Sequence, residues 1–207
     1  MCPKHPQPLC QNEGDGIVFR NVEELSKLAE EAPVKGATYM VGVDLAKYRD
    51  FTVISVMRGR KQVYLDRFNK IDWALQRQRI SAVSARYNDA EVLIDSTGVG
   101  DPIFEELSRA GLHVTPYQLN SRTKRELIDT LIVRMDKKEL ELLNNPIQKG
   151  ELKAYQYELT SGGNLRMNAP QGQHDDTVIA LALSVFKQPV VPVTRLITNR
   201  PRRASRF

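Results

Sequence analysis

Hydrophobic positions along the chain fall into two patterns, one typical of strands and one typical of helices. Apolar segments rich in β-branched residues follow one another at residues 38–45, 52–57 and 62–68, and a basic turn at residues 58–61 separates the last two. Such segments predict buried strands, and the short connection indicates that the second and third form a hairpin. We therefore expect three antiparallel strands in succession.

The next segments alternate between helix and strand. Large apolar residues recur at helical spacing over residues 72–87, which predicts an amphipathic helix. Residues 91–95 and 113–118 are typical of short buried strands, and the helix between them is expected to begin after Asp101 as its N-cap and to end near Gly111. Strand, loop and helix in this order indicate an α/β crossover, which joins parallel strands.

The last third of the sequence predicts two further helices and a hairpin. Ser121 is expected to cap a long helix that runs through Lys138. Alternating segments within residues 155–168 surround a turn signal at residues 161–164, which indicates a hairpin. Residues 177–186 are apolar nearly all round and predict a buried helix. Together these elements predict an α/β fold with a mixed central sheet, three antiparallel strands followed by parallel strands.

Composition separates the ends of the chain from its centre. The 207 residues, 41% of them hydrophobic, suffice for one domain with a substantial core, which we place at residues 17–188. Residues 1–16 are predicted to be a flexible leader, and residues 189–207 a basic tail rich in Pro and Arg. Cys2 and Cys10 are too few for a disulfide framework. The net charge of +5 favours a polyanionic partner.

Nothing in the sequence indicates a membrane or an exported protein. No stretch approaches the roughly 18 uninterrupted apolar residues of a membrane-spanning helix. Prolines stand near the N-terminus where a secretory signal would have an apolar run. We therefore expect a cytoplasmic protein with no membrane partner.

Acidic residues stand at the ends of three predicted elements. Asp44 ends the first strand, Asp95 ends the strand before the crossover, and Asp175 and Asp176 precede the buried helix. Strand carboxyl ends in α/β sheets face the functional crevice, and clustered carboxylates repel one another unless a cation neutralises them. Mg²⁺ prefers such oxygen ligands, and two ions can promote phosphodiester hydrolysis. The pattern predicts a metal-dependent phosphodiesterase site that holds two Mg²⁺ or Mn²⁺ ions.

Each of these acidic residues also has a purely structural interpretation. Asp44 could be a turn residue, although a charge attached to a buried strand is costly without a partner. Asp95 could begin the following loop, and Asp175 and Asp176 could complement the helix dipole. The prediction of a metal site depends on their conjunction. Asp101, which stands before a proline, is interpreted as an N-cap rather than a ligand.

Four segments resemble a known family, the nuclease domain of the large terminase subunit of tailed bacteriophages, in the ribonuclease H-like superfamily. They lie at residues 16–20, 43–46 with 50–52, 93–101 and 172–182, the last containing Gly172-Gln173-His174-Asp175-Asp176. The resemblance implies a ribonuclease H-like sheet with helices on both faces. It also implies a DNA endonuclease that cuts concatemeric viral DNA, with two divalent ions held by Asp44, Asp95 and Asp175 or Asp176.

The resemblance implies partners as well. They are double-stranded DNA, a packaging ATPase domain or chain, the small terminase subunit and the portal, in the cytoplasm of the infected bacterial cell. The sequence contains no Gly-x-x-x-x-Gly-Lys-Ser/Thr phosphate loop, so we expect this chain to bind no ATP. It would then be either an excised domain or the product of a split gene.

Other polar residues near the predicted crevice could assist. His174 could orient an Asp or approach the metal, or it could be a solvated loop residue. Basic residues in loops near the crevice are predicted to touch phosphates without reading sequence, although charge runs are often only solvated faces. These basic residues are Lys47, Arg49, Arg58, Arg60, Arg122 and Lys124.

Three other interpretations of the sequence stay open. The first is a junction-resolving or transposase-like nuclease of the same superfamily, since fold does not determine function. The second is a non-catalytic DNA-binding or scaffold module, which would bind DNA equally well without divalent metal. The third is an actin-like nucleotide-binding fold, which would respond to ATP.

Overall fold

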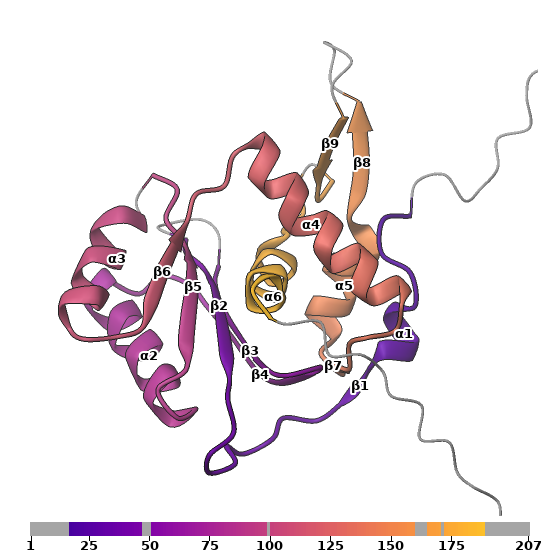
Figure 1. The fold of residues 1–207 in the computed structure, drawn as a ribbon. Helices are drawn as coiled ribbons and strands as arrows, with labels where there is room; N and C mark the ends of the chain where they lie inside the picture. The colour runs from indigo at the N-terminus through magenta and orange to yellow at the C-terminus, as the bar shows by residue number, and fades with distance from the viewer. Residues whose placement is uncertain (1–16, 47–50, 99, 160–164, 171, 189–207) are drawn as a thin grey trace, which may run out of the picture.

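The chain folds around a five-stranded mixed sheet in the order β4-β3-β2-β5-β6 (Figure 1). The computed structural model describes residues 17–46, 51–98, 100–159, 165–170 and 172–188. The strands of the sheet are β2 (Met40–Asp44), β3 (Thr52–Arg58), β4 (Lys61–Phe68), β5 (Glu91–Asp95) and β6 (Val114–Tyr117). Neighbours among β2, β3 and β4 are antiparallel, whereas β5 runs parallel to β2 and β6 parallel to β5. The predicted fold class is therefore confirmed.

The register of β2 and β5 brings two strand ends together. Val43 pairs with Ile94, so Asp44 and Asp95 are the next residues along two adjacent parallel strands. The strands themselves are almost continuously buried, because helices cover both faces of the sheet. The two carboxylates thus lie at one edge of the sheet, where the buried strands end.

Two helices, α2 (Trp73–Arg86) and α3 (Gly100–Arg109), cover one face of the sheet (Figure 1). Ile80, Val83 and Tyr87 recur at helical spacing and pack with strand residues in one buried cluster. The helical pattern predicted for this segment is confirmed, and its apolar side faces the sheet.

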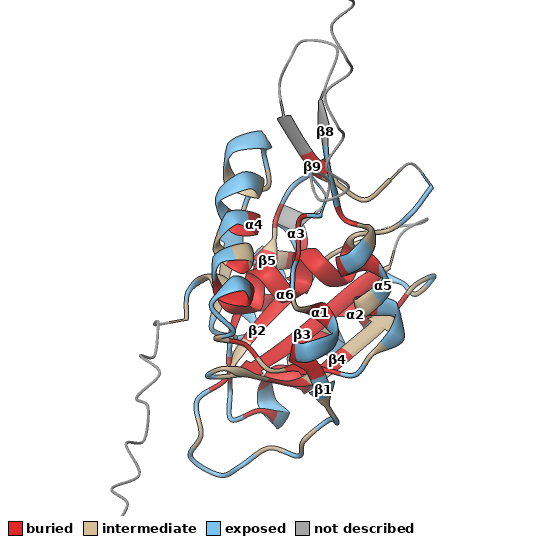
Figure 2. Ribbon diagram, turned by 90° about the vertical axis from the view of Figure 1, so that its right-hand side faces the viewer, coloured by how far each residue is buried: buried red, intermediate tan, exposed pale blue. Residues whose placement is uncertain are grey.

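The opposite face of the sheet is covered by α6 (Asp176–Phe186), and α4 (Ser121–Asp136) and α5 (Pro146–Ala154) pack against α6 in turn (Figures 1 and 2). All residues of α6 except the last are buried, as its uniformly apolar sequence predicts. The helix lies unusually close to β2 at Gly42. A Cβ atom at Gly42 would lie 2.1 Å from the carbonyl oxygen of Ala180.

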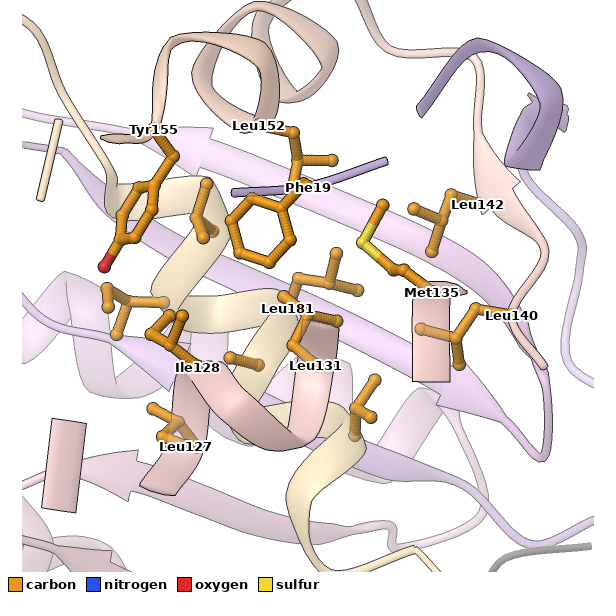
Figure 3. Close-up of a cluster of buried hydrophobic side chains, with 14 of the residues drawn as sticks. Phe19, Leu127, Ile128, Leu131, Met135, Leu140, Leu142, Leu152, Tyr155 and Leu181 are labelled. Carbon is orange, nitrogen blue, oxygen red and sulfur yellow. The ribbon is translucent and has the colours of Figure 1, made fainter. Parts of the chain in front are cut away.

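A second buried cluster joins α6 to α4, to α5 and to the segment at the start of the described chain (Figure 3). Its members include Phe19, Leu127, Ile128, Leu131, Met135, Leu140, Leu142, Leu152, Tyr155 and Leu181. Because this cluster and the one under α2 lie on opposite faces of the sheet, the central strands have no solvent-exposed face. The strands that end in Asp44 and Asp95, and the helix α6, are therefore attached to a buried core.

Four short elements lie outside the sequence-based prediction. They are α1 (Val22–Leu25), β1 (Ser26–Leu28), β7 (Leu142–Leu143) and α5, and β1 pairs in parallel with β7. A buried amide pair attaches α5 to β4. The side chains of Gln62 and Gln148 exchange two hydrogen bonds, each 2.8 Å long.

The predicted hairpin is present as β8 (Gln156–Leu159) and β9 (Leu165–Asn168), which pair antiparallel. In both ribbon views it projects beyond the body of the fold (Figures 1 and 2). The turn predicted at residues 161–164 lies outside the described residues, as do the leader and the tail. Within the described ranges, no helix has the length and apolar character needed to cross a membrane.

Two predicted helix caps are wrong. Asn120, rather than Ser121, caps α4, because its extended backbone lets its side chain accept hydrogen bonds from the first turn, including the backbone N–H of Thr123 at 3.1 Å. Thr123 completes a capping box by accepting from the backbone of Asn120. Helix α3 begins at Gly100, so Asp101 lies within the helix and not before it.

Candidate metal centre

Four acidic residues from three elements lie at one edge of the sheet. Asp44 and Asp95 end the adjacent strands β2 and β5, and Asp175 and Asp176 stand at the start of α6, which packs against β2. Asp44, Asp95 and Asp175 are half-buried, and Asp176 is buried. The structure thus brings together the four acidic residues predicted from the sequence.

The surroundings of Asp44 disfavour its charged form. Burial raises the pKa of Asp44 well above its ordinary value, and the nearby carboxylates of Asp95, Asp176 and Asp175 raise that pKa further, whereas Lys124 lowers it. Crowded carboxylates stay charged at low energetic cost only beside a cation. An all-oxygen donor set is also the one that Mg²⁺ and Mn²⁺ prefer. The residues present therefore fit a divalent ion in charge and in chemistry.

Basic side chains, rather than a closed ligand group, surround the acidic pair. Nζ of Lys124 lies 3.0 Å from Oδ2 of Asp175 and donates to Oδ1 of Asn168 at 2.9 Å. Arg67 lies 3.9 Å from Oδ2 of Asp176. Among the described residues, no three His, Cys, Asp or Glu side chains form a ready-made metal-binding group. Binding of an ion by these acidic residues would therefore require their side chains to move closer together.

Thr97 holds the carboxylate of Asp95 in place. Oδ1 of Asp95 accepts hydrogen bonds from the backbone N of Thr97 at 2.8 Å and from its Oγ1 at 2.6 Å. The same Oγ1 accepts from the backbone N of Leu119 at 2.7 Å, in the loop after β6. Asp95 therefore has the turn role considered from the sequence, and this turn also fixes the direction of its carboxylate.

His174 lies beside the buried member of the acidic pair. Its Nδ1 is 3.5 Å from Oδ2 of Asp176, and its ring meets the ring of Phe51 edge-on, with centroids 5.5 Å apart. The backbone N of Phe51 donates to the same Oδ2 at 3.3 Å. His174 is thus placed where it could orient Asp176, and that role stays a prediction.

The basic residues predicted to line the crevice are spread over the molecule. The turn between β3 and β4 lies at the end of the sheet opposite Asp44, because β3 runs antiparallel to β2. Arg58 pairs there with Glu31, and Arg60 donates to backbone carbonyl groups near the end of α4. The expected location of Arg58 and Arg60 near the carboxylates is therefore wrong. The antiparallel strands expected from the sequence already imply this position, whereas the pattern of charges does not show it.

Of the other four basic residues, Lys124 lies beside the acidic pair. Lys124 contacts Asp175, and the exposed Arg122 stands on the same first turn of α4. Lys47 and Arg49 lie outside the described residues. Contact of Lys124 and Arg122 with DNA stays a prediction.

Two residues beside the acidic pair were not singled out by the sequence pattern, Arg67 and Glu151. Glu151 accepts hydrogen bonds from Thr177 at the start of α6, and Arg67 lies 3.8 Å from the other carboxylate oxygen of Glu151. Burial raises the pKa of Glu151, and the Thr177 hydrogen bonds and the charge of Arg67 oppose that rise. No sequence signal pointed to Glu151, because α5 itself was not predicted.

Comparison with known proteins places the chain in a family. The family model for the terminase RNaseH-like domain matches residues 41–187. The large terminase subunits of Thermus virus P23-45 and Thermus phage G20c are 37% and 36% identical to the chain over 149 residues, which are 70% of this chain. The match spans 31% of the length of each of these relatives.

Solved structures agree with this assignment. The crystal structure of the large terminase nuclease from thermophilic phage G20c with bound magnesium is 32% identical, with a TM-score of 0.78, and covers 83% of this chain and 97% of that one. The same nuclease has been solved with bound cobalt and with bound zinc. The large terminase of the HK97 bacteriophage, at 15% identity and a TM-score of 0.60, shares the fold over 82% of this chain and 43% of its own length. The chain belongs to the terminase RNase H-like domain family, which confirms the resemblance noted in the sequence.

Proposed function

We propose that this chain is a metal-dependent DNA endonuclease that cuts concatemeric viral DNA during genome packaging. The observation that carries the proposal is the position of Asp44, whose carboxyl is crowded by three others from two further elements. Asp44, Asp95 and Asp175 or Asp176 would hold two Mg²⁺ or Mn²⁺ ions. Family membership and relatives solved with magnesium, cobalt or zinc support this assignment.

In this proposal the acidic side chains of the site bind the ions and the basic side chains bind DNA. When bound by these carboxylates, two divalent ions would supply an activated water and stabilise the leaving 3′ oxygen of the phosphodiester. The strands β2 and β5 hold Asp44 and Asp95 on a rigid sheet, and the buried α6 holds the acidic pair. Lys124 and Arg122 would neutralise DNA phosphates without reading the bases.

The proposed partners follow from the relatives. Because the match covers 31% of the large terminase subunits, we propose that a packaging ATPase domain or chain acts with this chain. Double-stranded DNA is the proposed substrate, and the small terminase subunit and the portal are proposed further partners in the cytoplasm of the infected cell. The chain itself would bind no ATP.

A plasmid cleavage assay tests the proposal. Supercoiled plasmid is incubated with wild type, Asp44→Asn, Asp95→Asn or the control Asp129→Asn, in Mn²⁺, Mg²⁺ or EDTA. Asp129 is an exposed acidic residue of α4 that pairs with Arg125 at 3.6 Å, away from the acidic edge. We expect nicking and linearisation with metal and none in EDTA. Each site variant should be at least about a hundredfold slower, or about 2.7 kcal/mol higher in barrier, because asparagine keeps the shape but removes the charge.

The plasmid assay, a junction substrate and a DNA-binding measurement together separate the alternatives. Cleavage in EDTA, or full activity in both site variants, would contradict the proposal. Selective cleavage of a four-way junction over linear duplex would favour a junction-resolving nuclease. Equal DNA binding with and without metal, without cleavage, would favour a DNA-binding module.

A further inference from the structure

Helix α6 begins at a residue whose side chain does not cap it. Asp175 occupies the N-cap position, but its backbone is not extended, with φ −126° and ψ 16°, and its side chain makes no capping hydrogen bond. An N-cap aspartate ordinarily accepts from the backbone N–H two or three positions further on. Instead, Oδ2 of Asp175 accepts from Nζ of Lys124 at 3.0 Å. The carboxylate is therefore directed away from its own helix.

Glu151 of the neighbouring helix α5 performs the capping instead. Its Oε2 accepts hydrogen bonds from the backbone N of Thr177 at 2.8 Å and from Oγ1 of Thr177 at 2.5 Å. Thr177 is the second residue of α6, whose N–H an N-cap side chain commonly satisfies. Glu151 is only 7% exposed, and a negative charge at this place also complements the helix dipole. The cap of α6 thus comes from another helix, 26 residues earlier in the chain.

Arg67 connects this cap to the acidic pair. Its guanidinium lies 3.8 Å from Oε1 of Glu151 and 3.9 Å from Oδ2 of Asp176. It also stacks 3.3 Å above the centre of the Phe51 ring. Both carboxylate side chains and the arginine are largely buried, so salt screens their interaction only weakly. The guanidinium of Arg67 therefore holds Glu151, which caps α6, in a fixed position relative to Asp176.

We infer that Glu151 is a positioning residue for the metal centre, because it caps α6 in place of Asp175 and so leaves the Asp175 carboxylate available to a divalent ion. This inference rests on the proposed function. Without Glu151, the buried N–H of Thr177 loses its acceptor, and an unsatisfied buried N–H destabilises the folded state. Aspartate is among the favoured N-cap residues, so Asp175 would turn toward that N–H and away from the site.

Direct metal binding tests this inference without depending on catalysis. Calorimetric titration with Mn²⁺ is performed on wild type, Glu151→Ala and Glu151→Gln. In Glu151→Ala the affinity for Mn²⁺ should fall about 10- to 100-fold, while cleavage recovers at saturating Mn²⁺. Glu151→Gln keeps an acceptor oxygen for Thr177, so its affinity should stay within about threefold of wild type.

A variant at the other end of α6 controls for loss of stability. Arg134 is 4% exposed, and its Nη1 donates to the carbonyl oxygen of Val185 at 3.2 Å. Arg134→Met should therefore destabilise α6 from its C-terminal end but leave Mn²⁺ affinity within about twofold of wild type, because distant sites act independently. Thermal unfolding in EDTA measures the stability of each variant.

The variants distinguish failure of the inference about Glu151 from failure of the proposed function. Should Glu151→Ala fail to fold, Glu151→Leu fills the same buried space without an acceptor and has the same expected loss of affinity. The inference is overturned if the alanine or leucine variant binds Mn²⁺ like wild type, if Arg134→Met loses as much affinity, or if Glu151→Gln loses as much as Glu151→Ala. A wild-type chain that neither binds Mn²⁺ nor cuts DNA would instead overturn the proposed function, before any variant is compared.

Discussion

Replacing Gly42 with alanine should separate α6 from β2. The added Cβ would lie 2.1 Å from the carbonyl oxygen of Ala180 and 2.3 Å from the backbone N of Ser184. Ordinary contacts of a Cβ begin at 3.4 Å, so the shorter distance must grow by about 1.3 Å. Both neighbours are helix backbone, which cannot rotate away as a side chain could. The whole helix must therefore move, or the strand must bend.

The size of the effect follows from this displacement. Overpacking a core costs about 1–3 kcal/mol and occasionally more, and the backbone contact at Gly42 places Gly42→Ala at about 3 kcal/mol or above. For a protein of this size, 3 kcal/mol lowers Tm by about 6–12 °C. Because β2 carries Asp44 and α6 carries Asp176, the same movement separates the carboxylates. A misplacement of about 1 Å in a catalytic site costs about a hundredfold in rate.

Calorimetric unfolding and plasmid cleavage, at a temperature where the variant is folded, measure these two effects. Gly150→Ala is the matched control, since Gly150 is an exposed helical residue of α5 and a Cβ there meets nothing within 4 Å. It should raise stability by about 0.5–1 kcal/mol, because alanine favours helix over glycine, and leave cleavage unchanged. A Tm of Gly42→Ala within about 2 °C of wild type, with full cleavage, would refute the close packing of α6 on β2.

Two further substitutions test the electrostatics and the core. In EDTA, Asp44→Asn should raise Tm at neutral pH, because the raised pKa of Asp44 means that the folded state binds its proton more tightly than the unfolded state. Ionised Asp44 should not destabilise wild type relative to the variant below the ordinary pKa of about 3.9. The destabilisation should then grow by about 1.4 kcal/mol per pH unit until the pH reaches the raised pKa of the folded state. A Tm difference independent of pH would contradict this. Gln148→Leu should cost about 1–3 kcal/mol in chemical denaturation, because the buried amide of Gln62 loses two of its hydrogen bonds. The double variant with Gln62→Leu should cost less than the sum of the single variants, and simple additivity would count against a coupled pair.

Sequence patterns predicted the elements whose periodicity is strong. The five strands of the main sheet and the helices α2, α3, α4 and α6 were expected close to their observed positions. The segment 142–154 escaped prediction because β7 has two residues and α5 only nine, with Gly150 in its middle. Such short elements are stabilised by tertiary contacts, here by the buried pair of Gln62 and Gln148, which no local pattern shows.

Some residues of the candidate site were likewise predicted from the sequence and others were not. Asp44, Asp95 and the acidic pair were found because each stands at the boundary of a predicted element, directly before or after a buried run. Arg67 and Glu151 lie within β4 and α5, and their relation to the site arises only when these elements pack beside the start of α6. Arg58 and Arg60 were expected to contact DNA because they are basic loop residues. The antiparallel strands, which the sequence also predicts, place that loop at the far end of the sheet.

Two residues outside the acidic group therefore determine how well it can function. Gly42 sets the distance between β2 and α6, since any side chain there would hold the helix away from the strand that bears Asp44. Glu151 sets the direction of the Asp175 carboxylate, since its capping of Thr177 leaves that carboxylate directed toward Lys124. Crowding four carboxylates at one buried edge destabilises the folded chain, as the raised pKa of Asp44 indicates. A rigid frame that holds their backbones in place despite this repulsion lets the side chains close around an ion, and the buried helix α6 gives the acidic pair such a frame.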